Sequence, residues 1–268
     1  MAWQARNRVV DAGTRVVLAV LFAVGCFLWW RSSDQADSDD VTRTVERQMT
    51  QGEYSKLYTA LKTHFPDDFA AERDGLARLT RANAGQDDFA VFLRISQDQL
   101  EARHVDDFAG ASSGALATFR TAEIAWKEAL YKQSAENCRS SSAMDITPGE
   151  GMRNSRSVPV EVGEMDYAMV MAMADGRKAK IRRAPPTQAD FEALYVAMAQ
   201  QGMTSADIGV AGRTEQAPGR SAEEICTLDL KTLKAIDSLP PAQADVFTVV
   251  SFRNIVNALS QQAGRAVT

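Results

Sequence analysis

Apolar residues recur at helical spacing along almost the whole chain from Val41 onward, and this pattern limits the possible folds more than any other feature. Side chains three or four positions apart lie on one face of a helix, so a repeated stripe predicts amphipathic helices packed on a core. β-type alternation is confined to two short stretches, 158–162 and 178–182. The sequence therefore predicts an all-α domain of eight to ten short helices, either an irregular multi-helix bundle or a helical-repeat-like domain.

Proline and capping residues divide this pattern into separate helices. Pro66 stops one apolar stripe, and the acidic pair after it is suited to begin the next. Thr187 follows two prolines, and Ser221 with Glu224 three residues later has the form of a capping box. We expect a succession of short helices with one longer member, over residues 113–138.

One stretch, residues 139–160, interrupts the helical pattern. It is rich in Ser, Gly and Arg, contains two prolines, and is longer than ordinary connections between helices. We expect it to be a long loop between two helical subdomains, 41–138 and 161–268. Glu150 lies within it, and an envelope hydrolase that uses carboxylates near this loop is one alternative function.

The N-terminal part carries a different pattern, because residues 16–30 form an apolar run without a polar side chain. This run rises about 22 Å as a helix, and extension back to Ala12, with Arg15 reaching the headgroups, brings it close to the thickness of a bilayer. Two tryptophans at its far end suit the membrane interface. We predict a single uncleaved transmembrane helix, with signal-peptide cleavage or lipidation at Cys26 as alternatives.

The distribution of charge predicts the orientation of this anchor. Residues 1–33 carry a net charge of +3 and the remainder −8, out of a total of −5. Because positive flanks stay in the cytoplasm, residues 1–15 are predicted to be a cytoplasmic stub and residues 31–40 an acidic linker to an extracytoplasmic domain. The inner membrane and the periplasm are the corresponding locations. A domain with this negative charge is not expected to bind nucleic acid.

Cys138 and Cys226 are the two cysteines outside the apolar run. An even number of cysteines in an oxidising compartment favours a disulfide between them, although two buried free thiols are the alternative. Neither lies in a C-x-x-C motif, which argues against a redox or zinc role. We predict a structural bridge.

Positive charge is concentrated at one place in the predicted domain. The five cations within seven residues are Arg177, Lys178, Lys180, Arg182 and Arg183. Outside the cytoplasm such a cluster suits an anionic envelope polymer, a lipid headgroup or an acidic protein. Cations at a helix C-terminus also offset the helix dipole, so a solvated helix end is the alternative interpretation.

Met165, Met169 and Met173 fall on one helical face. Clustered thioethers can bind Cu(I), but methionine is equally a core residue, and the small apolar residues between these three favour the core. We therefore predict no metal and no cofactor, and keep a methionine-based metal-handling protein as an alternative function.

Catalytic motifs are missing from the sequence, and neither His64 nor His104 lies in a ligand-spaced pattern. The acidic pairs at 67–68, 87–88 and 106–107 are interpreted as helix caps, because adjacent residues do not share a helix face. The leading hypothesis is a membrane-anchored extracytoplasmic interaction or scaffold protein of the cell envelope, with no catalytic residue assigned.

Overall fold

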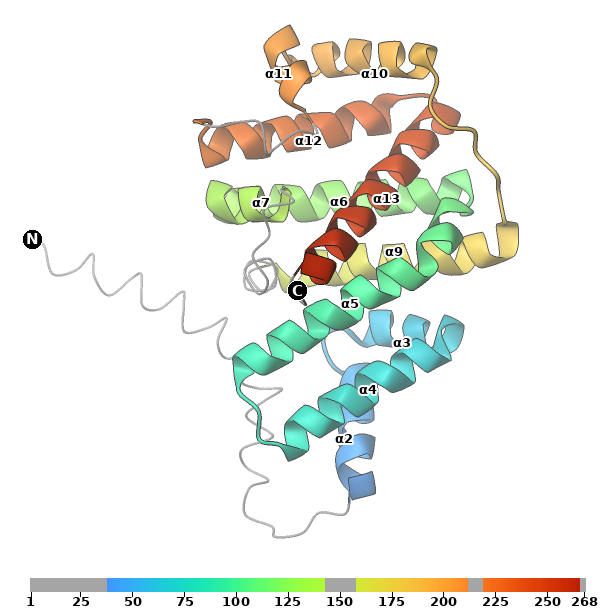
Figure 1. Ribbon diagram of the computed structural model, residues 1–268, viewed down its shortest axis with the longest axis vertical. Coiled ribbons are helices and arrows are strands. Elements are labelled where there is room, and N and C mark those ends of the chain that lie inside the picture. Colours follow the sequence, from blue (N-terminus) through green and yellow to red (C-terminus); the bar gives the residue numbers. More distant parts are fainter. Residues whose placement is uncertain (1–37, 143–157, 212–218, 266–268) are drawn as a thin grey trace, which may run out of the picture.

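The computed structural model describes residues 38–142, 158–211 and 219–265, and within these ranges the chain is helical, with no β-strand (Figure 1). The helices of these ranges are α2 (Ser38–Gln51), α3 (Ser55–His64), α4 (Pro66–Arg81), α5 (Gln86–Ala109), α6 (Ser113–Gln133), α7 (Ala135–Ser142), α9 (Pro159–Ala179), α10 (Gln188–Gln200), α11 (Ser205–Val210), α12 (Ala222–Ser238) and α13 (Pro241–Arg265). The all-α prediction is confirmed.

Helices that are neighbours in space are often distant in sequence (Figure 1). In one layer α10, α12, α6 with α7, α9 and α3 follow one another, and α5 and α13 cross in front of this layer (Figure 1). Helix α6 lies between α9 and α12, although both come after it in the chain. In a helical repeat each unit packs on the next one in sequence, and the contacts of α6 depart from that order.

The main apolar core extends from α2, α3 and α4 through α5, α6 and α9 to α13. The ring of Phe108 is fully buried and stacks on Phe252 at a centroid distance of 4.0 Å, while Phe119 meets Phe108 edge-on at 5.0 Å. A smaller cluster joins α10, α12 and α13. Residues on both sides of the range 143–157 contribute to the main core, and the division into subdomains 41–138 and 161–268 stays a prediction.

Capping boxes begin three of the C-terminal helices. The side chains of Thr187, Thr204 and Ser221 each accept the backbone N–H three residues on, and the acidic residue at that position bonds back to the cap. These bonds satisfy donors that a helix start leaves open. The helix starts predicted at Thr187 and Ser221 are confirmed, whereas the short α11 after Thr204 was not predicted.

Two predicted segments, the helix over residues 113–138 and the loop over residues 139–160, have different bounds in the structure. The helix expected over residues 113–138 is divided at Ser134, whose φ of −165° and ψ of 131° are extended, into α6 and α7. The long loop expected over residues 139–160 is helical at both ends, because α7 continues to Ser142 and α9 begins at Pro159. Proline is tolerated in the first turn of a helix, where its missing N–H has no partner to lose.

The predicted membrane anchor and its flanks lie outside the described residues. This applies to the stub 1–15, the run 16–30 and most of the linker 31–40, whose last residues form the start of α2. Among the helices of the described ranges, none combines the length and the apolar character needed to cross a bilayer. The anchor therefore remains a proposal from the sequence.

The C-terminal ends of α5 and α9 approach each other backbone to backbone at Gly176. A Cβ atom at this position would lie 1.8 Å from the carbonyl oxygen of Asp107 and 2.6 Å from the backbone nitrogen of Ala111. Two hydrogen bonds close the same junction, from the N–H of Ser112 to Asp175 Oδ2 at 2.6 Å and from that of Ile181 to the Gly110 carbonyl at 3.0 Å. Only glycine allows this contact, because the obstructing atoms belong to the backbone.

The Gly176→Ala substitution is expected to lower the free energy of unfolding by about 1–3 kcal/mol, since the new methyl group forces two helix ends apart. Urea unfolding of the full chain, followed by circular dichroism, measures the change. Gly114→Ala in α6 is the matched control, because nothing lies within 4 Å of its Cβ position. Equal stability of the Gly176→Ala protein and the wild type would show that the two helix ends do not meet this closely.

Candidate functional site

The two cysteines of the predicted pair are joined. Cys138 in α7 and Cys226 in α12 form a disulfide with a Cα–Cα distance of 5.6 Å, and both are fully buried. Leu130, Val158 and Leu230 pack around the sulfurs. The bridge fastens α12 to the short helix that follows α6, so it is part of the scaffold rather than of an exposed redox site.

Two of the five clustered cations point back into the protein. The Arg177 guanidinium lies over the ring of Phe65 at 4.3 Å and donates to Asp107 Oδ2 at 3.0 Å and to the carbonyl of His64 at 3.2 Å. Arg183 donates to the carbonyls of Ala109 and Ala111 at 2.9 and 2.6 Å. Both side chains therefore hold the segment after α9 against the end of α5.

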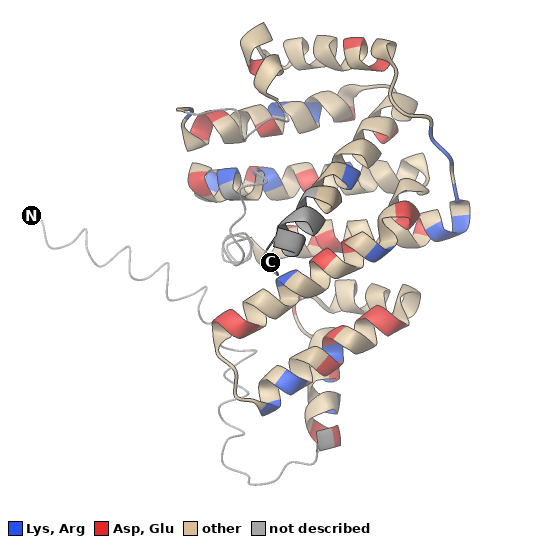
Figure 2. Ribbon diagram, viewed as in Figure 1, with Lys and Arg blue, Asp and Glu red and all other residues tan. Residues whose placement is uncertain are grey.

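The other three cations, Lys178, Lys180 and Arg182, are exposed, and we call them the basic corner. The side chains of these three make no hydrogen bond or ion pair with another residue of the described ranges. Lys180 ends α9 in the left-handed conformation, with φ of 50°, which turns the chain at this point. Figure 2 shows the positive charge where α9 passes into the extended segment at the edge of the molecule.

His104 lies in a polar cluster that sequence reasoning missed. Its Nε2 is 2.8 Å from Asp68 Oδ2, and its Nδ1 is 3.0 Å from both Asp107 Oδ2 and Arg177 Nη2. Nδ1 donates to Asp107 when it carries a proton and accepts from Arg177 when it does not. The backbone of α5 is non-helical at His104, with φ of −114° and ψ of 16°.

This cluster fastens helix ends together and shows no machinery for nucleophilic catalysis. Each ring nitrogen of His104 already faces a carboxylate, and no hydroxyl or thiol of the described residues bonds to the imidazole. Two members came from pairs that we interpreted as caps, at 67–68 and 106–107. The signal that could have found them was one histidine among acidic residues, which is too common to be specific.

Three carboxyl groups from three helices share one largely buried region: Glu72 of α4, Glu101 of α5 and Asp166 of α9. Tyr58 donates to Glu72 Oε1 at 2.8 Å, while Gln97 Nε2 donates to Glu101 Oε1 at 3.1 Å and to Asp166 Oδ1 at 3.3 Å. Helix α5 packs on both α4 and α9, and these contacts bring the three side chains into one region.

These carboxyl groups bind protons more tightly than exposed ones. Burial raises the pKa of Glu72 and of Glu101 to about 7. Burial, reinforced by the negative charges of Glu101 and Glu72, raises the pKa of Asp166 to about 8. Removal from water disfavours the charged form of an acid, and nearby carboxylates disfavour it further. This group, which we call the carboxyl cluster, is therefore partly protonated at neutral pH.

A buried ion-pair network joins α6 to the C-terminal helices. Arg120 is 6% exposed and donates to Asp245 Oδ1 from Nη1 and to Asp237 Oδ1 from Nε, both at 3.1 Å. Arg183 donates to the other oxygen of Asp245 at 3.1 Å, and the hydroxyl of Ser113 donates to that oxygen too. One carboxylate thus stabilises two guanidinium groups, which explains why Arg183 is not available to a partner.

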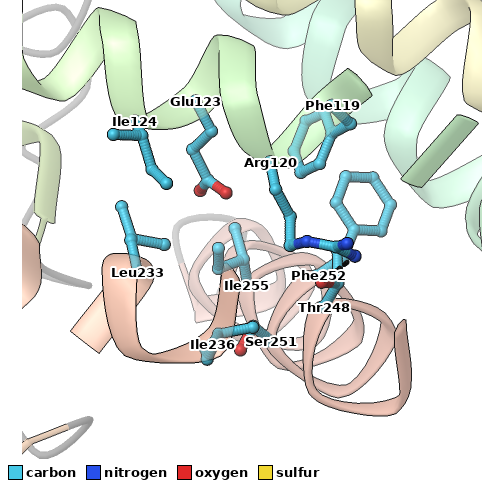
Figure 3. Close-up of a pocket in the computed structure, with 10 residues that line it drawn as sticks. All are labelled: Phe119, Arg120, Glu123, Ile124, Leu233, Ile236, Thr248, Ser251, Phe252 and Ile255. Carbon is cyan, nitrogen blue, oxygen red and sulfur yellow. Dashed lines mark hydrogen bonds between the residues drawn. The ribbon is translucent and has the colours of Figure 1, made fainter. Parts of the chain in front are cut away.

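A small pocket lies beside this network, between α6, α12 and α13 (Figure 3). Its free volume is about 30 Å³, which is room for one or two water molecules rather than for an enclosed organic substrate. Most of its lining is apolar, and Figure 3 shows the carboxyl group of Glu123 directed into it. Burial raises the pKa of Glu123 to about 7.

The predicted methionine face belongs to the core. Met165, Met169 and Met173 are 8%, 3% and 0% exposed and pack in the main cluster. No group of three or more His, Cys, Asp or Glu residues of the described ranges is arranged to hold a metal ion. Glu150, the candidate acid of the hydrolase alternative, lies outside the described residues.

Comparison with protein families, with curated proteins and with solved structures finds no match to this chain. The sites that remain for interpretation are the basic corner, the His104 cluster, the carboxyl cluster and the Glu123 pocket. Of these, the basic corner combines full access to solvent with a rigidly held backbone.

Proposed function

We propose that this protein is a membrane-tethered interaction protein of the cell envelope and that its basic corner binds an acidic partner. The observation that carries the proposal is that the five cations have two different structural roles. Arg177 and Arg183 fix the backbone on both sides, while Lys178, Lys180 and Arg182 face the solvent. A charged surface that is already ordered loses little conformational entropy on binding, which favours affinity.

The surrounding charge supports the same proposal. The chain outside residues 1–33 carries a net charge of −8, so three exposed cations at one edge make a local positive site on a negative domain. Such contrast steers an acidic partner to one surface and repels it from the others. The apolar run 16–30 supports tethering, and the arginines before it support an extracytoplasmic domain.

Replacing the basic corner with acids in the triple variant Lys178→Glu/Lys180→Glu/Arg182→Glu is expected to reduce partner capture at least tenfold. A photo-crosslinking residue at Ala184, an exposed position beside the corner, captures the partner in intact cells, and mass spectrometry identifies it. Co-sedimentation with isolated cell-wall polymer tests the second kind of acidic partner. Capture should also weaken as salt is added, because exposed charges are screened.

The matched control carries the same change of charge elsewhere, as Arg47→Glu/Arg78→Glu/Lys132→Glu on exposed positions of α2, α4 and α6. It should keep capture near the wild-type level. Equal capture by the corner variant and the wild type, or equal loss in both triple variants, would contradict a binding role of this corner. The corner variant leaves Arg177 and Arg183 in place, so its fold is expected to persist.

A further inference from the structure

The pocket between α6, α12 and α13 contains one charged group without a partner. Its apolar walls are Ile124 of α6, Leu233 and Ile236 of α12, and Ile255 of α13. Ile255 is 45% exposed and stands at the mouth, so the pocket communicates with solvent. Figure 3 shows the Glu123 carboxyl group inside these walls, directed toward the space between the helices.

The Glu123 carboxyl group makes no hydrogen bond or ion pair with a residue of the described ranges, although the positive charges of Lys127 and Arg120 favour its ionised form from a longer distance. The two cations near it already have carboxylate partners: Arg120 is paired with Asp237 and Asp245, and the Nζ of Lys127 lies 2.9 Å from Asp229. A carboxylate that is removed from water without a partner is unfavourable, and an opposite charge relieves this cost. The pocket therefore holds a carboxyl group with which no cation of the described ranges pairs directly.

We propose that this pocket binds a primary ammonium group carried on a short alkyl chain. An ammonium head group is compact enough for the free volume of about 30 Å³, and the alkyl chain that carries it leads out through the side of the pocket that is open to solvent. Its three N–H donors suit a carboxylate with open lone pairs, and the apolar walls suit the attached methylene groups. The same chemistry occurs in small free amines and in the side chain of a partner's lysine.

A metal ion does not fit this environment as well as an organic cation does. Hard cations such as Ca²⁺ and Mg²⁺ take six or more oxygen ligands. The side chains that line the pocket offer one unpaired carboxyl group, the hydroxyls of Thr248 and Ser251, and otherwise hydrocarbon or the Arg120 guanidinium. An ammonium group needs fewer oxygens and gains from the hydrocarbon.

Titration of the full chain with n-propylammonium at pH 8 tests the proposal, with methyl NMR signals of Ile124, Leu233 and Ile255 as the readout. We expect saturable shifts with a millimolar dissociation constant and at least tenfold weaker binding of n-propanol, which has the same shape without the charge. Binding should weaken about tenfold at pH 6, because Glu123 has a pKa near 7 and the amine stays protonated over this range.

Three variants test whether binding depends on Glu123 and on this pocket. Glu123→Gln keeps the shape of the side chain and is expected to lose at least tenfold in affinity, whereas Glu128→Gln, on the same helix and paired with Lys234, should bind like the wild type. Ile255→Trp should also weaken binding by narrowing the mouth. Equal binding of propanol and propylammonium, or wild-type affinity in Glu123→Gln, would overturn the proposal.

A second ligand separates the two sources of the ammonium group. Nα-acetyl-lysine methylamide carries it on a side chain attached to a peptide unit. Binding of both compounds supports a pocket that accepts a partner's lysine, and binding of propylammonium alone supports a pocket for free amines. Binding of neither would overturn the inference, and it would leave the proposed role of the basic corner unaffected because the two sites share no residue.

Discussion

Replacement of Asp245 by alanine is expected to lower the free energy of unfolding by about 3–5 kcal/mol, since removal of one member of a buried ion pair leaves its partner charged and unpaired. Asp245 is 1% exposed, and its two oxygens accept from Arg120 and Arg183, each at 3.1 Å. Without this carboxylate, Arg120 keeps only the half-exposed Asp237 as an acidic partner. Urea unfolding of the full chain measures the loss.

The Asp237→Ala variant provides a matched control for this prediction. Asp237 bonds the same guanidinium at 3.1 Å but is 41% exposed, so its removal should cost less than about 1 kcal/mol. Adding Arg120→Met to Asp245→Ala should recover part of the lost stability, because the apolar side chain needs no counter-charge. Similar losses in the two single aspartate variants would contradict a special role of the buried carboxylate.

The helix boundaries that could be predicted from sequence are those set by local chemistry. Thr187 and Ser221 cap their helices through residues three positions away, and Pro66 stands in the first turn of α4. Such interactions span one turn, so their residues appear together in the sequence. Ser134 also caps its helix, because its hydroxyl accepts the N–H groups of Glu136 and Asn137. Neither a proline nor an acidic residue three positions on accompanies it, so the break between α6 and α7 was missed.

The order of the helices in space could not be predicted in the same way. Helix α9 packs between α3 and α6, and the close contact at Gly176 depends on the backbone of residues 107–111. In a sequence, a glycine near the end of a helical pattern predicts the C-terminus of that helix. Its actual reason, the approach of a second helix, becomes visible only when the two segments are placed together.

The partners of the residues in the candidate sites were even harder to predict from the sequence. Among the five clustered cations, the sequence gives no sign that Arg177 pairs with Asp107 and Arg183 with Asp245, at separations of 70 and 62 residues. The disulfide was an exception, since only two cysteines of the predicted domain were available to pair. Where many residues of one charge compete for partners, composition alone does not choose among them.

The carboxyl cluster is expected to make the protein less stable as the pH rises from 6 to 8. Glu72, Glu101 and Asp166 have pKa values near 7, 7 and 8 in the folded chain, well above those of the unfolded chain. The native state therefore holds more protons than the unfolded state in this range, and stability falls with pH. For a net difference of about one proton, the loss over these two units is about 3 kcal/mol.

In the acidic range, stability is expected to fall as the pH decreases. The backbone and side-chain hydrogen bonds of Thr204, followed by the side chain of Arg220, lower the pKa of Asp207 to about 2. Bonds from Ser221 likewise lower the pKa of Glu224. Groups of this kind stabilise the fold above about pH 4.5 and lose that effect as they are protonated. Stability should therefore be greatest at about pH 4–4.5, because above this range the unfolded chain has released the protons that the carboxyl cluster of the folded chain still holds.

Thermal unfolding of the full chain at half-unit steps from about pH 3 to pH 9 measures the fall of stability on both sides of this maximum. The Glu101→Gln/Asp166→Asn variant keeps the two oxygens that accept from Gln97 but removes two titrating groups, so it should flatten the decline above pH 6. Glu53→Gln, at an exposed position before α3, should leave the profile unchanged. An unaltered decline in the double variant would place its origin elsewhere, with Glu123 the next group to replace, since its pKa is also raised to about 7 by burial.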